Sequence, residues 1–453
     1  MFVVVAALVM WLGVLSGCWR SHARSDGSRL DAGLDAHEPE LDADTTVDAG
    51  CVPQLSVPTD CRVDWARAIG SDAYVVIPGR VRVREDGSAL ALVQPVSGAH
   101  MRIDSFELGV GGFSALLSFD RGGAVSWALD SRGETLWTNR DVVSNTRGYP
   151  HGLERLAVAD GSLLSAEPLP DTSYLHALAQ AGCAATCATR EVRALSWHDR
   201  VDLGALGVLE APFGFSIVLL EDDAPRWHWS TSLDFGLAPI VIFPTTGIAP
   251  DGSLTFLLWT GGYPTPAPLC LVGAPCFNFP DTLLVRLSPT GTVDFARVLR
   301  AARSLVMTDD GGSIVSANDE LKRFDARGER VWRNDRVGGF GGLLATDART
   351  GDLWATLGIP EAPLDLAGTT VTGCELNVGV SVLVTLDPFT GEFVRTNGTF
   401  RGWATAMEPH PEGGVVMELA TYGRPSSQTM CGRTIQRDDV PGGPIDLIVA
   451  HVR

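Results

Sequence analysis

The sequence predicts an all-β fold, on the evidence of its composition and of two kinds of repeated hairpin. Its 453 residues include 50 Gly and 27 Pro, and 45% of them are hydrophobic. Such a composition is typical of many short strands joined by tight turns rather than of long helices. The repeats, described next, determine which all-β architecture is expected.

The first repeated hairpin is an acidic-glycine or related turn that leads into a strand of alternating pattern. Asp-Gly favours the positive φ angles of a two-residue hairpin turn. Copies of this turn begin at Asp86, Asp160, Asp251, Asp310, Thr350 and Glu412.

The second repeated hairpin is an apolar strand, an Asp or Ser, a glycine turn, and a strand that carries an aromatic residue or valine. Clear copies cover 284–295, 321–332 and 383–394, and looser copies cover 116–127, 127–137 and 217–229. We expect the glycine to set the turn and the aromatic residue to set the packing.

The two ends of the chain each carry half of a second hairpin. Residues 446–452 match its opening strand, and residues 63–67 match its closing strand. Pairing of the C-terminal strand with the N-terminal one would complete a hairpin and remove exposed edges. The sequence therefore predicts a β-propeller of about six blades, with room for a seventh near Trp127. Uneven spacing predicts long loops around 171–200 and 260–280, and a short helix over 171–181.

The N-terminus predicts export. Phe2 to Val14 form an apolar run of 13 residues, shorter than the roughly 20 that span a bilayer as a helix. The run is typical of a signal-peptide core. Leu15 to Cys18 then resemble the bacterial lipobox, which implies lipidation of Cys18. No Lys or Arg precedes the run, in contrast to the usual signal. By the same resemblance, Trp19 after the cysteine favours the outer membrane or cell surface.

Residues 18–60 are predicted to be a disordered linker after the signal peptide of residues 1–17. Eight acidic residues against three arginines lie within 19–50, a composition that cannot bury a core. The roughly 40 residues have a reach of roughly 35 Å as a flexible coil. Calcium binding by these aspartates is an alternative, but the segment 42–47 lacks the glycine of a calcium loop. The propeller domain is then expected over 61–453.

Eight cysteines remain after Cys18, and an even number in an exported chain predicts disulfides. Closeness in sequence suggests sequential pairs, although spacing does not establish the connectivity. Zinc binding is the alternative for Cys183 and Cys187, but no second pair of cysteines lies at the spacing of a zinc finger. The candidate pairs are Cys51 with Cys61, Cys183 with Cys187, Cys270 with Cys276, and Cys374 with Cys431.

The repeats resemble those of quinoprotein-like bacterial propellers, in which an apolar strand, Asp-x-x-Gly and Trp recur. The resemblance covers residues 61–453 and implies architecture only. Quinone-dependent members of that family often have two adjacent cysteines, and no two cysteines are adjacent here. The resemblance therefore does not extend to catalysis or to a cofactor.

A search for catalytic motifs identifies no catalytic, cofactor or metal residues. The nine histidines lack zincin and haem spacings, and no nucleophile elbow or phosphate loop occurs. Trp227 and Trp229 flank His228. The two indoles could form a platform for a carbohydrate or a cation, but packing against a neighbouring sheet is the simpler interpretation. Trp65, Trp137 and Trp332 are expected to pack between blades.

The charge excludes one class of partner. The net charge is -19 and Lys322 is the single lysine, so no basic surface is expected to neutralise nucleic acid. The leading hypothesis is a cell-envelope lipoprotein, anchored in the membrane by lipid, whose propeller is a non-catalytic scaffold for a protein or glycan partner. A quinoprotein-like or polymer-acting enzyme and an outer-membrane assembly scaffold are the alternatives.

Overall fold

The computed structural model describes one compact unit, and its described residues all lie within 52–142 and 147–453. The predicted signal peptide, the predicted lipidation site Cys18 and the acidic segment lie outside the described residues, as do Cys51, Cys183, Cys187 and Cys374. The structure describes residues 54–55 and 61–453, except for 71–74, 85, 98–99, 110–111, 121–123, 130–134, 141–151, 158–161, 169–172, 182–189, 222–223, 233–240, 250, 260–268, 275, 278–281, 318–319, 336–341, 359–363, 367, 373–379, 422–424 and 438–442.

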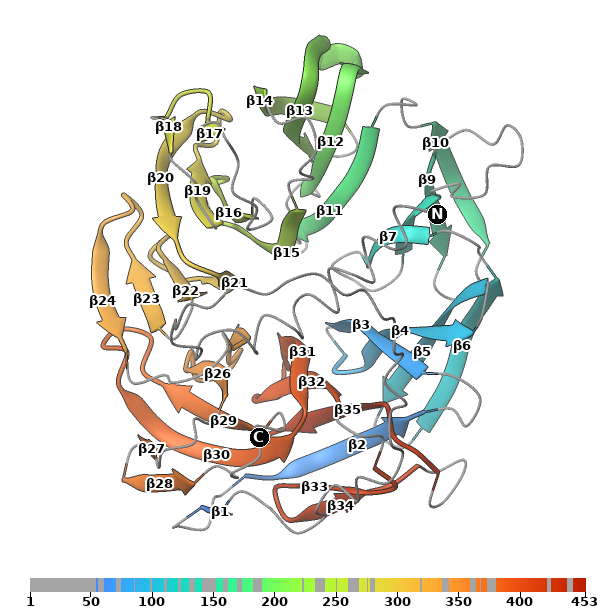
Figure 1. The fold of residues 1–453 in the computed structure, drawn as a ribbon, viewed down its shortest axis with the longest axis vertical. Helices are drawn as coiled ribbons and strands as arrows, with labels where there is room; N and C mark the ends of the chain where they lie inside the picture. Colours follow the sequence, from blue (N-terminus) through green and yellow to red (C-terminus); the bar gives the residue numbers. More distant parts are fainter. Residues whose placement is uncertain are drawn as a thin grey trace, which may run out of the picture. The chain divides into compact units, whose positions relative to one another are not determined.

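The described residues form seven four-stranded antiparallel sheets (Figure 1). Sheet 1 contains β3 (Val75–Val83), β4 (Ala89–Ser97), β5 (His100–Gly109) and β6 (Gly112–Asp120). Sheet 2 contains β7 (Ala124–Leu129), β8 (Thr135–Arg140), β9 (Gly152–Ala157) and β10 (Leu163–Pro168). Sheet 3 contains β11 (Ser173–Ala181), β12 (Arg190–Asp202), β13 (Val208–Glu221) and β14 (Ala224–Ser232), with a 3-10 turn, η2 (Gly204–Leu206), between β12 and β13.

Sheets 4 to 7 complete the set. Sheet 4 contains β15 (Val241–Ile248), β16 (Leu254–Trp259), β19 (Thr282–Leu287) and β20 (Val293–Leu299). Sheet 5 contains β21 (Ala302–Met307), β22 (Ser313–Ala317), β23 (Glu320–Phe324) and β24 (Arg330–Asn334). Sheet 6 contains β25 (Leu344–Thr346), β26 (Leu353–Gly358), β29 (Val380–Leu386) and β30 (Phe393–Arg401). Sheet 7 contains β31 (Trp403–Pro409), β32 (Val415–Ala420), β35 (Leu447–Val452) and β2 (Val63–Ile69).

The arrangement of the sheets is that of a β-propeller. The first strands of sheets 2 to 7 contact one another in chain order, and β31 of sheet 7 also contacts β3 of sheet 1. The apolar core lies in the layers between neighbouring sheets. Between sheets 4 and 5, for example, Leu284 and Phe295 pack against Val315 and Phe324. The all-β propeller predicted from the repeats is confirmed, and seven described sheets correspond to the larger of the two expected blade counts.

Sheet 7 is built from both ends of the chain. Strand β2 pairs antiparallel with β35, and Trp65 stands opposite His451 (Figure 1). Outside the strands, Arg62 and Arg453 exchange two backbone hydrogen bonds of 2.9 Å. The two half hairpins recognised at the ends of the sequence therefore pair with each other, as predicted.

Three inserted hairpins follow the second strands of sheets 4, 6 and 7. They are formed by β17 (Leu269–Cys270) with β18 (Cys276–Phe277), by β27 (Leu364–Leu366) with β28 (Thr369–Thr372), and by β33 (Gln428–Met430) with β34 (Arg433–Ile435). β27 and β33 both contact β30, and β34 contacts β2. These inserts cover the last strands of sheets 6 and 7, which would otherwise present free edges. A further strand, β1 (Gln54–Leu55), pairs with β28 and lies before residue 61, the expected start of the domain.

Two local predictions are wrong. The helix expected over 171–181 is strand β11, because pairing with β12 along its length outweighs the helical preference of its Ala and Leu residues. The hairpin expected over 116–127 does not form either. β6 and β7 belong to different sheets, so this stretch is a connection between blades.

A repeated contact joins an aromatic residue on the last strand of one sheet to a turn glycine of the next. Cβ atoms built on Gly328 and Gly391 would lie 2.6 Å from the rings of Phe295 and Trp332, respectively. Both glycines have positive φ, +77° and +73°, so the turn and the packing each require glycine. The indole of Trp332 also donates to the carbonyl of Pro388 at 3.1 Å. The expected role of Trp332 between blades is confirmed.

Candidate functional site

Several buried ionisable side chains of sheets 4 to 7 lie at the same end of their sheets. Strands alternate in direction in each sheet, so the turn after the first strand lies at the same end as the end of the third strand, which leads into a turn in sheets 4 to 6 and is the end of β35 in sheet 7. We call this the turn end. In sheets 4 to 7, the first hairpins of the repeat form the turn between the first and second strands. In sheets 4 to 6, the second hairpins form the turn between the third and fourth strands.

Two arginines on third strands link neighbouring sheets at the turn end. Arg286 on β19 donates to the backbone carbonyl of Gly311, in the first turn of sheet 5. Arg323 on β23 pairs with Asp310 at 2.5 Å in its own sheet and donates to the carbonyl of Pro388 in sheet 6 at 3.3 Å. Both arginines are buried, and each has carboxylate neighbours in its own sheet, Asp251 and Asp294 for Arg286 and Asp310 for Arg323.

Asp347 in the first turn of sheet 6 makes the next link. Its Oδ2 accepts the backbone N–H of Gly414 in sheet 7 at 2.6 Å, and its Oδ1 accepts the N–H groups of Arg349 and Thr350. Burial alone would raise the pKa of Asp347, but these N–H groups outweigh it and hold the pKa below its ordinary value. The guanidinium of Arg349 adds a bond to the carbonyl of Glu412 at 3.2 Å.

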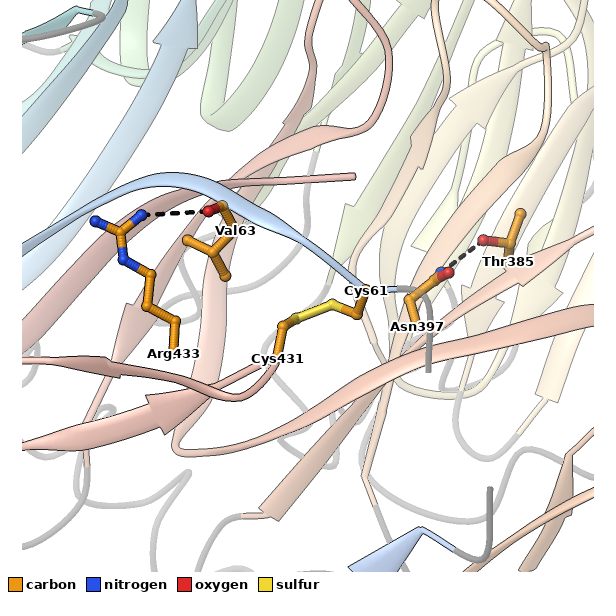
Figure 2. The surroundings of a disulfide bond; sticks show 6 residues. All are labelled: Cys61, Val63, Thr385, Asn397, Cys431 and Arg433. Atoms are coloured by element: carbon orange, nitrogen blue, oxygen red, sulfur yellow. Dashed lines mark hydrogen bonds between the residues drawn. A yellow bond between two sulfur atoms is a disulfide. The ribbon is translucent and has the colours of Figure 1, made fainter. Parts of the chain in front are cut away.

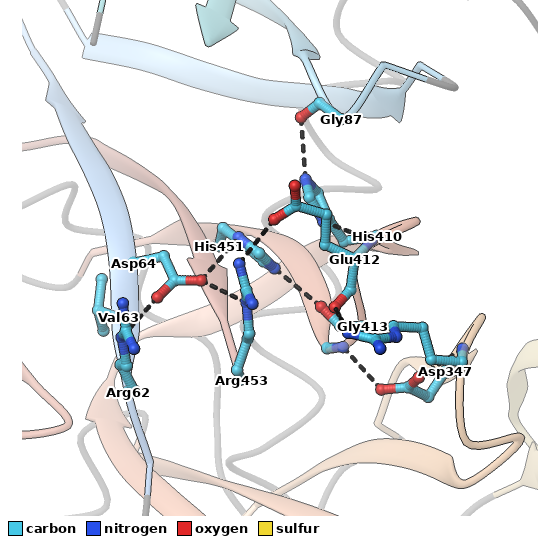
Figure 3. Close-up of polar contacts among 12 residues, drawn as sticks. Arg62, Val63, Asp64, Gly87, Asp347, His410, Glu412, Gly413, His451 and Arg453 are labelled. Carbon is cyan, nitrogen blue, oxygen red and sulfur yellow. Dashed lines mark hydrogen bonds and ion pairs between the residues drawn. The ribbon is translucent and has the colours of Figure 1, made fainter. Parts of the chain in front are cut away.

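Two buried histidines occupy the turn end of sheet 7 (Figure 3). The rings of His410, in the first turn, and His451, on β35, are stacked with centroids 3.8 Å apart and planes inclined by 27°. Nε2 of His410 lies 2.9 Å from the carbonyl of Gly87 in the first turn of sheet 1. Nε2 of His451 lies 2.9 Å from the carbonyl of Gly413. The pair therefore joins sheet 7 to sheet 1.

Asp64 on β2 anchors the N-terminal strand to this pair. Its Oδ2 lies 3.4 Å from Nδ1 of His451 and also pairs with Nε of Arg453. Its Oδ1 pairs with Nε of Arg62 at 2.7 Å. Arg453 reaches further to Glu412 at 2.8 Å. The carboxylate thus gathers positive groups from both ends of the chain (Figure 3).

The bonds of the two imidazoles define what they can do chemically. Nδ1 of His410 accepts the N–H of Glu412 at 3.2 Å, so its Nε2 carries the proton and donates to Gly87. Nε2 of His451 faces a carbonyl and therefore donates as well. A general base needs a free nitrogen lone pair that faces a substrate proton. Neither Nε2 provides one, so the geometry of this pair is that of a link between sheets.

The environment of His451 opposes its protonation. Burial of the ring lowers the pKa of His451 below its ordinary value, and the neighbouring His410 and Arg453 act in the same direction. The bond to Gly413 and the carboxylate of Asp64 favour the charged form but do not compensate for the burial.

The cysteines form a different pattern from the one predicted. Cys61, just before β2, is bonded to Cys431, in the turn between β33 and β34 (Figure 2). The pairs Cys51 with Cys61 and Cys374 with Cys431 are therefore wrong. Closeness in sequence misled because sheet 7 brings together residues separated by 370 positions. A Cβ on Gly398 of β30 would lie 3.1 Å from the Cys61 sulfur, so the bridge packs against sheet 6.

The two cysteines of the inserted hairpin in sheet 4 agree with their predicted pairing at the backbone level. Cys270 stands directly opposite Cys276 in the pairing of β17 with β18, and Cys276 is disulfide-bonded. The pairing of these two residues stays a prediction, as does the pairing of Cys183 with Cys187.

The tryptophan cluster on β14 is sheet packing. Trp227 and Trp229 are both buried in the core between sheets 3 and 4. Trp229 donates to the carbonyl of Val272 at 3.2 Å, in the insert of sheet 4, and Trp227 lies against Gly291. His228 is half-buried, and burial lowers its pKa. The expected packing role of Trp65 is also confirmed, since it lies in the apolar cluster between sheets 7 and 1.

Two searches of the described part of the chain returned nothing. No group of three or more His, Cys, Asp or Glu residues there is arranged to hold a metal ion. Across the same residues, no helix has the length and hydropathy needed to cross a bilayer.

Comparisons with known proteins found similar solved structures but no relative in sequence. No family model and no curated protein matches it. Among solved structures it is similar to the Dos1 propeller, with 7% identity over 86% of this chain and 95% of that chain, at a TM-score of 0.47. It is also similar to Chaetomium thermophilum Sqt1, solved with the N-terminus of ribosomal protein L10, with 9% identity over 86% and 100% of the two chains and a TM-score of 0.43.

A protein of unknown function from Bacteroides caccae is a further match, with 11% identity over 72% of this chain and 93% of that chain and a TM-score of 0.36. Likenesses of this degree assign no function to the chain. The quinoprotein-like relationship suggested by the repeats stays a prediction.

Proposed function

We propose that the chain is a lipid-anchored protein of the bacterial cell envelope whose propeller is a non-catalytic scaffold for a protein partner. The anchor is supported by the apolar run Phe2 to Val14 followed by the lipobox-like residues Leu15 to Cys18. The scaffold is supported by the use of buried polar side chains at the turn ends.

The proposal rests on one observation, the bonds that these buried polar side chains make between neighbouring sheets. Arg286, Arg323, Asp347 and His410 each bond to the backbone of the following sheet. Buried ionisable groups at an active site typically face a substrate, whereas these stiffen the frame. A rigid frame that holds variable loops in place is the usual basis of recognition.

The anchor is tested with Cys18→Ser. Cells fed a palmitate analogue that carries a chemical handle should label the wild-type protein, and the variant should lose both the label and its place in the membrane fraction. Cys51→Ser is the matched control, because it removes another N-terminal cysteine and should keep the label. Absence of label on the wild type would disprove lipidation.

The scaffold is tested by cross-linking in intact cells before solubilisation in detergent. Because Lys322 is the single lysine and the chain has 54 Asp and Glu residues, a carboxyl-reactive reagent is needed in place of an amine-reactive one. We expect one protein to co-purify in stoichiometric amount, with cross-links confined to one side of the propeller. Turnover of an added substrate, such as reduction of a dye with a quinone cofactor supplied, would contradict the non-catalytic role.

A further inference from the structure

His451, one member of the histidine pair of sheet 7, occupies a position that arginine occupies in sheets 4 and 5. Arg286 stands opposite Thr255, Arg323 opposite Ile314 and His451 opposite Val416. Each of these partners is the second residue of the second strand in its sheet. The three residues are therefore equivalent in register.

The exchange of arginine for histidine changes how the link responds to pH. Arginine keeps its charge at every physiological pH, whereas imidazole gains a proton near pH 6.5 in an unperturbed setting. The links from sheet 4 to sheet 5 and from sheet 5 to sheet 6 therefore do not titrate there. The link from the first turn of sheet 7 to the first turn of sheet 1 is made by the imidazole of His410, on which His451 stacks.

A second proton on His410, or a charge on both rings at once, opposes the arrangement seen in the structure. His410 uses Nδ1 as an acceptor for the N–H of Glu412, and a proton on Nδ1 would leave two donors facing each other at 3.2 Å. Protonation of both rings would place two cations in a buried stack with centroids 3.8 Å apart. Either event destabilises the buried turn that holds His410 against Gly87.

Charged groups surround the pair on each element packed against it. Asp64 is the group that favours a proton on His451, but Arg453 and Arg62 already neutralise its two oxygens. The remaining charges nearby are Glu412 in the same turn, Asp347 and Arg349 in the first turn of sheet 6, Asp86 in the first turn of sheet 1, and the ion pair of Arg82 with Glu408 at 3.0 Å between β3 and β31.

We propose that His410 and His451 form an acid-sensitive latch, which holds the two chain ends and sheet 1 together at neutral pH and loosens in mildly acidic conditions. The bonds of His410 require a neutral imidazole, and the buried stack disfavours two charged rings. The elements that the two rings join are the N-terminal strand, the C-terminal strand and the first turn of sheet 1. The latch does not depend on which partner the scaffold binds.

The direction of the pH effect follows from proton linkage. The pKa of His451 is lower in the folded protein than in the unfolded chain, so the unfolded chain binds more protons in mild acid. The contribution of this residue to stability is complete above about pH 6.5, the ordinary value, and declines as the pH falls below it.

Hydrogen exchange of the full-length protein tests the latch. Exchange measured by mass spectrometry at pH 7.5 and pH 5.5, corrected for the intrinsic rate, should show a several-fold loss of protection in β2, in residues 86–90 and in β31 to β35. Peptides from β19 to β24, joined by arginine, provide an internal control and should keep their protection. A uniform loss in both regions, or no loss in either, would overturn the proposal.

Variants separate the latch from other titrating groups. His410→Gln and His451→Gln keep an amide donor for the carbonyls of Gly87 and Gly413 but do not titrate, so the local response to pH should largely disappear. His228→Gln on β14 is the matched control, because it removes another partly buried histidine and should leave the response intact. If the first two variants respond to pH as the wild type does, the latch is disproved. The comparison of regions within the wild-type protein tests the proposal even if a variant fails to fold.

Discussion

Different side chains join neighbouring sheets at two comparable junctions, the one between sheets 4 and 5 and the one between sheets 7 and 1. In the first, Arg286 bonds to the turn of the next sheet and Phe295 packs on Gly328. In the second, His410 bonds to the corresponding turn, and Trp65 lies in an apolar cluster with residues of β3 and β4. The repeat fixes where a link is made, and the side chain at that place decides how strong and how responsive it is.

The two junctions also differ in how the chain connects them. Sheets 4 and 5 are joined through two residues, Arg300 and Ala301, between β20 and β21. Sheet 7 is completed by a strand that is nearly four hundred residues away in sequence, and a disulfide between Cys61 and Cys431 secures that strand. A junction formed by distant parts of the chain has a larger entropic cost, which a covalent bridge reduces.

The largest effect is expected from Cys61→Ser. A bridge across a separation of 370 residues restricts the unfolded chain strongly, and the chain-entropy model gives about 6 kcal/mol for it. We expect a loss of about 4 to 6 kcal/mol in the free energy of unfolding, measured by urea denaturation under oxidising conditions. Cys276→Ser is the matched control, with about 2 kcal/mol for the short loop of its predicted pairing. Equal losses in the two variants would contradict this account.

The next effect concerns the aromatic-glycine contact. Gly391→Ala places a methyl group 2.6 Å from the ring of Trp332 and forces alanine into a φ of +73°. We expect a loss of about 3 kcal/mol, the sum of backbone strain and overpacking. Gly351→Ala has nearly the same φ, +76°, but no atom within 4 Å, so it should lose only about 1 kcal/mol. Thermal midpoints measured side by side separate packing from conformation.

A smaller effect is expected at Asp347. Asp347→Asn weakens the bond to the N–H of Gly414 and should lower the free energy of unfolding by about 1 to 2 kcal/mol at pH 7. The pKa of Asp347 is lowered in the folded state, so its contribution is present above its ordinary value and is lost as the pH falls below about 4. The difference from the wild type should therefore shrink in acid.

Asp387→Asn is the control for that measurement. Asp387 accepts the N–H groups of Phe389 and Thr390 within its own turn, and these bonds do not reach another sheet. It should lose less stability than Asp347→Asn. An equal or larger loss would show that the bond between sheets contributes little.

The last prediction concerns connectivity rather than stability. Because Cys61 is bonded to Cys431, the sequential partners expected for them, Cys51 and Cys374, are left over. β1 begins three residues after Cys51, β28 ends two residues before Cys374, and β1 pairs with β28. We expect peptide mapping of the unreduced protein to recover a Cys51–Cys374 cross-link. Recovery of either cysteine as a free thiol would exclude it.

The repeats made the architecture predictable from sequence. An Asp-Gly turn predicts a positive φ at its glycine, and Gly87, Gly252 and Gly311 all have a positive φ. The incomplete hairpins at the two ends predicted the pairing of β2 with β35, because an apolar strand pattern without a partner indicates a strand from elsewhere in the chain.

The site was less predictable because its members are separated in sequence and have no motif. His410 and His451 lie 41 positions apart, and only the folding of sheet 7 stacks them. One signal was available: aligning the third strands places His451 where Arg286 and Arg323 stand. The disulfide was missed for a related reason, since proximity along the chain is a poor guide where a sheet joins the two ends.

The pairing of the N-terminal strand β2 with the C-terminal strand β35 also determines when the protein can finish folding. β35 is the inner neighbour of β2, so the first long strand to leave the ribosome has no partner until Val452 has been synthesised. Vectorial synthesis can complete sheets 1 to 6 one after another, but sheet 7 must assemble afterwards. In the exported protein that we propose, this order would leave the N-terminal strand unpaired throughout translocation and make the Cys61–Cys431 bridge a late event in maturation.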